Sequence, residues 1–226
     1  MTEVYGFYPR KKSIFSFLSL TVTLIMINVL VFIIFLVMLF FFKNNPEVLY
    51  DYIALKPSNI LHGKYLWTFI TSMFLHGGLF HLFANMLSLI FIGSLVERII
   101  GTKRYLFFYI ISGLFAGLFF VASSLIFTSD LNTFAVGASG ALFGLVGLLV
   151  LLTPNLPVYV MFIPIPIKMK YAGPGILALL WFISVAGDLP IGNTAHLGGL
   201  VAGVFYGLYL KKKYSKKTKY ISKHFS

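Results

Sequence analysis

Four polar residues with catalytic chemistry stand within long apolar stretches of this sequence: His81, Asn85, Ser139 and His196. A serine hydroxyl is a poor nucleophile alone and needs an adjacent base to take its proton. Ser139 and His196 could supply that pair if the fold brings them together. His81 and Asn85 are spaced i, i+4 and would share one face of a helix. The four side chains therefore suggest acyl-transfer chemistry within the apolar part of the chain. Whether they can perform it depends on the elements that position them.

Composition excludes a water-soluble protein. Of the 226 residues, 59% are apolar or aromatic and 11% are charged, against about 25% charged in an average soluble domain. The mean hydropathy is +0.93. These values also exclude a disordered chain and a collagen repeat, and they indicate an integral membrane protein. Because the chain has no cysteine, disulfides and thiolate metal sites are excluded.

Six apolar segments are predicted as membrane-spanning helices, since a bilayer core of about 30 Å needs about 20 residues. They are residues 14–42, 69–96 (with the span proper starting near residue 78), 105–127, 134–152, 171–186 and 195–210. The first is too long for the apolar part of a signal peptide, so we expect it to be retained. The prediction is an all-α membrane protein with a long outer loop between its first two helices. Its parts are an inner N-terminal segment (1–13), a six-helix domain (14–210) and a basic inner C-terminal tail (211–226).

The net charge of +12 would usually suggest nucleic-acid binding, but its distribution favours a topological role. With six spans and the N-terminus inside, fifteen of the 18 Lys and Arg residues lie on the inner side, as the positive-inside rule requires. We therefore predict a multi-pass protein of the cell membrane with both termini cytoplasmic, and no nucleic-acid partner. The basic tail could also touch anionic lipid.

The four polar residues fall in one layer. Spans 2, 4 and 6 run in the same direction, and a rise of 1.5 Å per residue places these side chains roughly 20–26 Å from the inner ends of their spans. The layer lies about 5–10 Å below the outer surface of a 30 Å core. Small residues surround it: Gly137 and Gly140 flank Ser139, while Gly199 and Gly203 follow His196 at the spacing of close helix packing.

Ordinary structural interpretations exist for each residue. A serine in a span usually bonds the carbonyl of its own preceding turn, and a single histidine or asparagine can bridge two helices. His76 lies at a boundary between loop and span and is expected to be a structural hydrogen bonder. The shared depth argues against all of these interpretations together.

Three stretches in order carry a family resemblance: HGGLFHLFANM (76–86), GASG (137–140) and AHLGGLVAG (195–203). They lie on the second, fourth and sixth predicted spans, and the chain resembles the rhomboid intramembrane serine proteases over about residues 67–210. The resemblance implies a six-helix rhomboid bundle of the bacterial or archaeal type, with a Ser139–His196 dyad. It also implies that His81 and Asn85 help an oxyanion hole, and that the substrates are single-pass membrane proteins.

Further positions match or depart from the family pattern. Phe143 matches the aromatic residue that packs on the catalytic imidazole in relatives. Many members carry Trp-Arg in the first loop, whereas this chain has Trp67-Thr68, so the anchoring of that loop and its lipid contacts are in question. Glu97 matches the inner end of span 2, where we expect it to pair with Arg98 or Arg104.

The predicted mechanism has Ser139 attack a peptide carbonyl while His196 takes and later returns the proton. No acidic residue is available at that depth, so a dyad is expected. The Asn85 amide, His81 and the Ser139 backbone amide are the predicted oxyanion donors. No metal or cofactor is expected, because the His-Glu-x-x-His motif is absent. Water should reach the layer through a break at the glycine-rich start of span 4, and span 5 with loop 187–194 is the predicted gate.

Two other classes of function stay open from the sequence. A channel or small-solute transporter would also place polar residues inside a bundle, although no inverted repeat is visible. An inactive rhomboid-like protein would bind transmembrane helices without cutting them. The predicted partners are transmembrane-helix substrates and membrane lipid, and the sequence indicates no particular oligomeric state.

Overall fold

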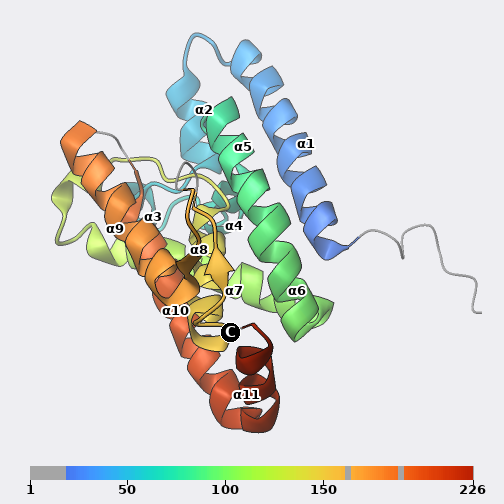
Figure 1. Cartoon of the computed structure of the whole chain (residues 1–226). Coiled ribbons are helices and arrows are strands. Elements are labelled where there is room, and N and C mark those ends of the chain that lie inside the picture. The colour runs from blue at the N-terminus through green and yellow to red at the C-terminus, as the bar shows by residue number, and fades with distance from the viewer. Residues whose placement is uncertain (1–18, 161–163, 188–190, 226) are drawn as a thin grey trace, which may run out of the picture.

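The computed structural model describes residues 19–160, 164–187 and 191–225, and it is mostly helical (Figure 1). The α-helices are α1 (Leu20–Phe41), α2 (Pro46–Ile53), α3 (Pro57–Leu61), α4 (Thr68–Thr71), α5 (Leu79–Ser88), α6 (Ser94–Ile100), α7 (Thr102–Ser123), α8 (Ser139–Leu152), α9 (Met169–Gly187), α10 (Asn193–Lys213) and α11 (Ser215–His224). Two 3₁₀ turns, η2 (Ser72–Phe74) and η4 (Thr128–Asp130), and a π-helical turn, η3 (Leu89–Gly93), complete the helical elements. A two-stranded antiparallel sheet pairs β1 (Pro157–Val158) with β2 (Ile167–Lys168).

Four helices in the described part of the chain are long and apolar enough to cross a membrane. They are α1, the continuous helix Leu79–Ile100 formed by α5, η3 and α6, α7, and α9. Helix α8 has only 14 residues, and α10 begins with polar residues and ends with three lysines. The chain is thus a helical, multi-pass membrane protein, and the six-span arrangement stays a prediction.

Several predicted boundaries differ from the structure. The fourth span was expected over residues 134–152, but its helix begins only at Ser139. The preceding residues cannot continue the helix, because Ala135 pairs with Leu55 in a β-bridge and Gly137 has a φ of +117°. The long outer loop contains α2 and α3, and the basic tail contains α11. Residues 14–18 of the first predicted span lie outside the described residues.

Glu97 joins the start of α1 to the junction of α6 and α7. Its carboxylate accepts hydrogen bonds from the backbone amides of Leu20 and Thr21, both at 3.0 Å, and from the Thr21 hydroxyl at 2.8 Å. The Thr102 hydroxyl donates to it as well, at 3.0 Å. The first amides of a helix lack partners and form the positive end of its dipole. The expected pairing with an arginine was therefore wrong, since the helix start takes this carboxylate.

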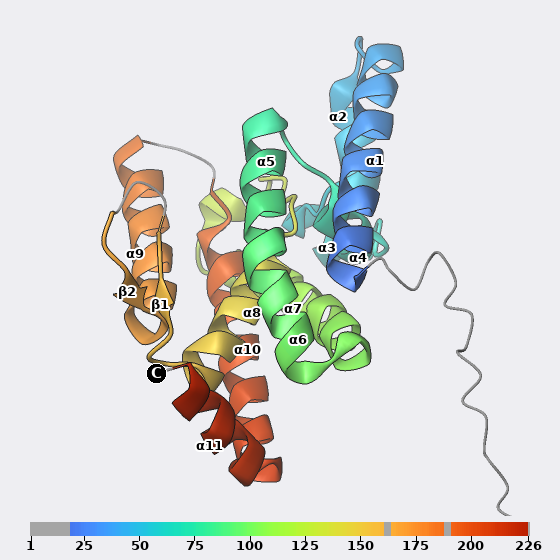
Figure 2. The ribbon, with the colours of Figure 1, turned by 45° about the vertical axis from the view of Figure 1, so that its right-hand side comes forward.

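Helix α8 lies at the centre of the bundle. Ten of its residues are buried, and it packs against α7, α9 and α10. In both views α8 and α10 lie side by side in the middle, while α1 and α9 stand at opposite edges (Figures 1 and 2). Helix α9 buries only four residues in the described structure: Met169, Ala172, Gly173 and Leu177. The sequence elements that carry the candidate chemistry therefore converge on the most buried helix.

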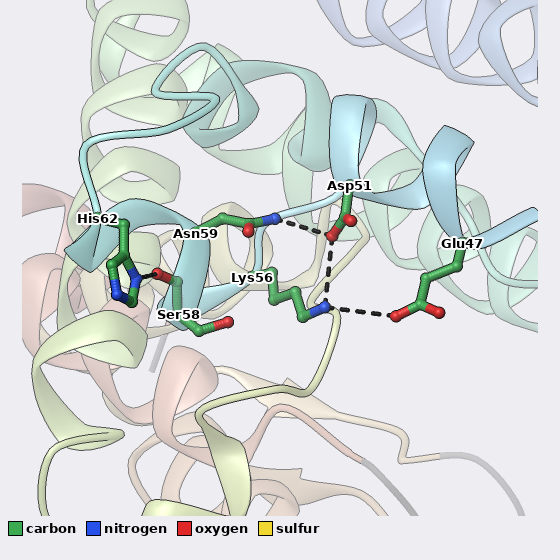
Figure 3. A network of polar contacts seen from close by, with 6 residues as sticks. All are labelled: Glu47, Asp51, Lys56, Ser58, Asn59 and His62. Atoms are coloured by element: carbon green, nitrogen blue, oxygen red, sulfur yellow. Dashed lines mark hydrogen bonds and ion pairs between the residues drawn. The ribbon is translucent and has the colours of Figure 1, made fainter.

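The loop between α1 and α4 is held by Lys56, at the centre of a polar network (Figure 3). Lys56 Nζ lies 3.4 Å from Asp51 Oδ1 and 3.6 Å from Glu47 Oε1. Its ammonium group also lies 4.8 Å from the centre of the Phe134 ring. Because residues 134–138 lead directly into α8, these contacts tie the loop to the segment that ends at Ser139.

Trp67 and Thr68 are also anchored. The Trp67 indole N–H donates to the Tyr52 carbonyl at 2.7 Å, and the Thr68 hydroxyl donates to the Tyr65 carbonyl at 2.7 Å. The loop is thus fastened by these bonds and by Lys56, although threonine stands at position 68, where the resemblance implied an arginine.

Candidate active site

Ser139 and His196 meet across two helices. Ser139 is the first residue of α8, and His196 stands in the first turn of α10. Ser139 Oγ and His196 Nε2 lie 2.8 Å apart, which is hydrogen-bond distance. Other serines of the chain bond their own helix, as Ser88 does when it donates to the Ala84 carbonyl at 2.8 Å. Ser139 has no preceding helical turn to bond, so its hydroxyl faces the imidazole.

The two helices approach closely because glycines line their contact. A β-carbon on Gly199 would collide with the Gly140 carbonyl oxygen, and one on Gly203 with the Gly144 carbonyl oxygen. On the facing helix, a β-carbon on Gly147 would collide with the Leu200 carbonyl. Backbone therefore meets backbone along the α8–α10 contact, and this approach brings the serine within reach of the histidine.

Phe143 holds the imidazole from one side. Its ring stacks on His196 with centroids 4.6 Å apart and an interplanar angle of 22°. His196 is only 7% exposed, and its Nδ1 has no hydrogen-bond partner in the described structure. No carboxylate among the described residues orients the ring as a third catalytic member would. Stacking and the bond to Ser139 are the contacts that fix its position.

His81 lies in the same corner, against Gly137. A β-carbon on Gly137 would lie 2.9 Å from both Cε1 and Nε2 of the His81 ring and 3.6 Å from Ser139 Oγ. Gly137 adopts a φ of +117°, an angle that residues with a β-carbon rarely adopt. Its amide donates to the Ser72 carbonyl at 2.8 Å. Glycine is thus needed here for its backbone angle and for the space that the His81 ring fills.

Asn85 is buried, and its amide is partly engaged. Asn85 Nδ2 donates to the His81 carbonyl at 2.9 Å, within α5. An amide nitrogen carries two hydrogens, so one remains for another acceptor. The structure thus brings Ser139, His196, Phe143 and His81 together around one point, while Asn85 supports the helix turn that carries His81.

His76 packs against His81 and was expected to be structural. Their rings meet edge to face, with centroids 5.2 Å apart. His76 Nδ1 lies 3.3 Å from the Phe74 carbonyl. Burial lowers the pKa of His76 to about 4, and the nearby His81 acts in the same direction. His76 is therefore neutral at neutral pH, and its ring packs against His81. Within the described ranges, no group of three His, Asp or Glu side chains is arranged to hold a metal ion.

A family model described as the Rhomboid domain matches residues 63–213. This chain belongs to the rhomboid family. The matched region of this rhomboid contains Ser139, His196, His81 and Asn85, whereas α1, α2 and α3 precede it.

Relatives of this rhomboid include active and inactive proteins. RHOMBOID-like protein 1 of Arabidopsis thaliana is 40% identical over 159 residues, covering 68% of this chain and 37% of the relative. Rhomboid protease GluP of Bacillus subtilis (strain 168) is 30% identical over 166 residues, covering 72% and 29%. Inactive RHOMBOID-like protein 8 of Arabidopsis thaliana is 34% identical over 140 residues, covering 61% and 36%. The chain spans less than half the length of each of these three relatives.

Proposed function

We propose that this rhomboid is an intramembrane serine endopeptidase that hydrolyses peptide bonds in or near the transmembrane segments of single-pass membrane proteins. The observation that carries the proposal is the 2.8 Å approach of Ser139 Oγ to His196 Nε2, with Phe143 stacked on the imidazole. A nucleophile beside an oriented base is the arrangement that acyl transfer requires.

Ser139 Oγ attacks the carbonyl carbon of the scissile bond while His196 Nε2 takes the hydroxyl proton. His196 then returns that proton to the leaving amine, and an acyl-enzyme ester remains on Ser139. A water molecule, deprotonated by the same nitrogen, attacks the ester carbon. The bond to Ser139 Oγ then breaks, the acid is released, and His196 returns the proton to Oγ. Nε2 must accept a proton, so the neutral ring carries its hydrogen on Nδ1, the atom without a partner in the described structure.

The negative oxygen of the tetrahedral state needs donors aimed at it. The backbone amide of Ser139 is one candidate, because the first amides of a helix have no partner within it. The His81 ring beside Gly137 and the second hydrogen of the Asn85 amide are the others. Together these three donors form the proposed oxyanion hole.

The proposed topology has six spans, with both termini cytoplasmic and the dyad near the opposite face. Substrate would pass α9, which buries few residues, and the loop 187–194, whose residues 188–190 lie outside the described structure. Since the chain contains no cysteine, single-cysteine variants Lys216→Cys and Asp130→Cys can be labelled from each side. We expect them to react from opposite sides, and labelling from one side would refute the topology.

An inactive binder of transmembrane helices is the second candidate, because a 34% identical relative is named inactive. A serine-reactive phosphonate probe separates the two. We expect the probe to label the wild type, and the Ser88→Ala control to be labelled equally, because that hydroxyl bonds its own helix. Ser139→Ala should lose both labelling and cleavage of a panel of single-pass substrates while keeping its thermal stability. A folded wild type that the probe does not label, and that cuts no substrate, would favour the binder.

A further inference from the structure

An apolar groove of about 270 Å³ lies between α7 and α10, away from Ser139. It is lined mainly by aromatic side chains: Phe107, Phe108 and Phe115 from α7, and Ala202, Phe205 and Tyr206 from α10. The groove faces outward from the bundle, since Phe107 is 68% exposed and Phe205 is 64% exposed. In a membrane this surface meets lipid chains.

The groove leads to two cations. Arg104 precedes Phe108 by one turn on α7, and Lys213 ends α10. Tyr206 continues the groove's aromatic lining, since its ring stacks on Phe108 with centroids 4.5 Å apart. The two cations lie over one ring beyond it: the Arg104 guanidinium is 5.1 Å and Lys213 Nζ is 5.7 Å from the centre of the Tyr214 ring. The aromatic row continues to Tyr209 on α10, whose ring centroid lies 6.0 Å from that of Tyr206.

Both cations are held by tyrosines and lack acidic partners. Arg104 donates to the Tyr214 hydroxyl at 3.1 Å, and Lys213 donates to the Tyr209 hydroxyl at 2.8 Å. Neither forms an ion pair with a carboxylate in the part of the chain that the structure describes. Glu97, the acidic residue at this end of the described helices, is engaged at the start of α1. Two positively charged side chains without acidic partners therefore lie beyond one end of the apolar groove.

We propose that the groove and this cation pair bind one anionic phospholipid, with an acyl chain along the groove and the headgroup phosphate between Arg104 and Lys213. The length fits: Phe115 to Arg104 spans about 17 Å at 1.5 Å per residue, close to half of a 30 Å hydrocarbon core and thus to one leaflet. The charge selects an anionic headgroup, and arginine is well suited to phosphate oxygens. The site is independent of the proposed proteolysis.

Binding to the purified full-length chain would test this site, with fluorescent phosphatidylglycerol and phosphatidylcholine as probes. Two cations near a phosphate should make phosphatidylglycerol bind about 30-fold more tightly. The double variant Arg104→Gln/Lys213→Gln should lose this preference. The control Lys216→Gln/Lys217→Gln removes the same charge from exposed positions of α11 and should keep it. Equal losses in the two double variants would show that only diffuse surface charge acts, and would overturn the site.

The groove itself needs a separate variant. Ala202→Leu narrows it without changing charge and should weaken binding of both lipids, with its thermal unfolding in micelles of a non-ionic detergent measured to verify the fold. Unchanged lipid binding by this variant would overturn the role of the groove. Glycerol phosphate, which has the headgroup without chains, should not compete at the concentration where phosphatidylglycerol does. Equal competition would replace the lipid site with a plain phosphate site.

Discussion

Helices α8 and α10 touch through their backbones, whereas α9 contacts α8 through the tips of side chains. Gly199 and Gly203 face carbonyl oxygens of α8 so closely that no methyl group fits. On α9, Gly173 faces the side chains of Val146 and Val150, and a β-carbon added at Gly175 would have no atom within 4 Å. Both α9 and α10 pack on α8, but only the contact between α8 and α10 fixes the position of one helix relative to the other.

This difference suits two tasks. A nucleophile and its base must be held within about 0.5 Å of their working geometry, and backbone contact between rigid helices provides this. A helix that admits a substrate must separate from its neighbours at low cost, and such elements come from the least buried parts of a fold. Under the proposed function, α8–α10 is the fixed frame and α9 is the movable part.

Among variants outside the dyad, the largest effect is expected from Gly199→Ala. Its methyl group would collide with the Gly140 carbonyl, a backbone atom that cannot rotate away, so α10 must shift relative to α8. Overpacking of this kind costs about 1–3 kcal/mol or more, and a displacement of 1 Å at the dyad can cost about 100-fold in rate. Thermal unfolding and turnover of a transmembrane substrate should both fall. Wild-type activity in this variant would break the argument that backbone contact fixes the dyad.

Asn85→Ala should come next. A main oxyanion donor is worth about 10²–10³ in rate, but here His81 and the Ser139 amide share the load, so we expect about 10- to 100-fold. The loss should lower kcat and kcat/KM together, because the negative oxygen exists only in the transition state. Ser88→Ala, one turn further along the same helix, is the matched control and should keep normal kinetics. A raised KM with unchanged kcat would place Asn85 in substrate binding instead.

The Asn85 variant also needs a stability measurement, since the side chain bonds the His81 carbonyl. If thermal stability is preserved, the kinetic loss belongs to the site. If kcat stays normal in a stable variant, the proposed role of Asn85 in the oxyanion hole is wrong.

The sequence predicted the approach of Ser139 to His196 better than the contacts that hold the surrounding segments in place. Depth along a helix follows from a fixed rise per residue, so one layer could be assigned to Ser139 and His196, and in the structure their atoms lie 2.8 Å apart. The glycine at 137 likewise predicted a break before α8, where φ is +117°. These inferences needed only local geometry and the bilayer thickness.

The contacts that hold the surrounding segments join distant parts of the chain, which spacing does not reveal. Glu97 meets amides 76 and 77 positions away along the chain, and its sequence neighbours suggested an arginine instead. The role of Lys56 depends on a loop that folds back onto Phe134. Asn85 differs from both, because it shares a face with His81 as expected and its bond to the His81 carbonyl is a local contact across four residues.

Phe143→Leu should have a moderate effect. Leucine keeps an apolar side chain on α8 but removes the ring stacked on His196. Such aromatic contacts are worth about 0.5–1.5 kcal/mol, so turnover should fall about 2- to 13-fold through a less ordered imidazole. Phe143→Tyr keeps the ring and should restore most of the rate. If leucine and tyrosine variants are equally active, stacking does not orient the base and the bond to Ser139 suffices.

The smallest effect, and the one of opposite sign, is expected from Gly175→Ala on α9. No atom lies within 4 Å of the added β-carbon, and alanine within a helix is favoured over glycine by about 0.5–1 kcal/mol. For a chain of this size the gain corresponds to a Tm increase of about 1–4 °C, measured by thermal unfolding beside Gly199→Ala.

Gly175 follows Pro174, which already interrupts the hydrogen bonding of this helix. If α9 moves as a unit, turnover of a transmembrane substrate should stay close to that of the wild type. A lowered Tm would mean that α9 is packed as tightly as α10, and the contrast between the two helices would fail. A raised Tm with slowed turnover would sharpen it instead, because the helix would then have to bend at this glycine when a substrate passes.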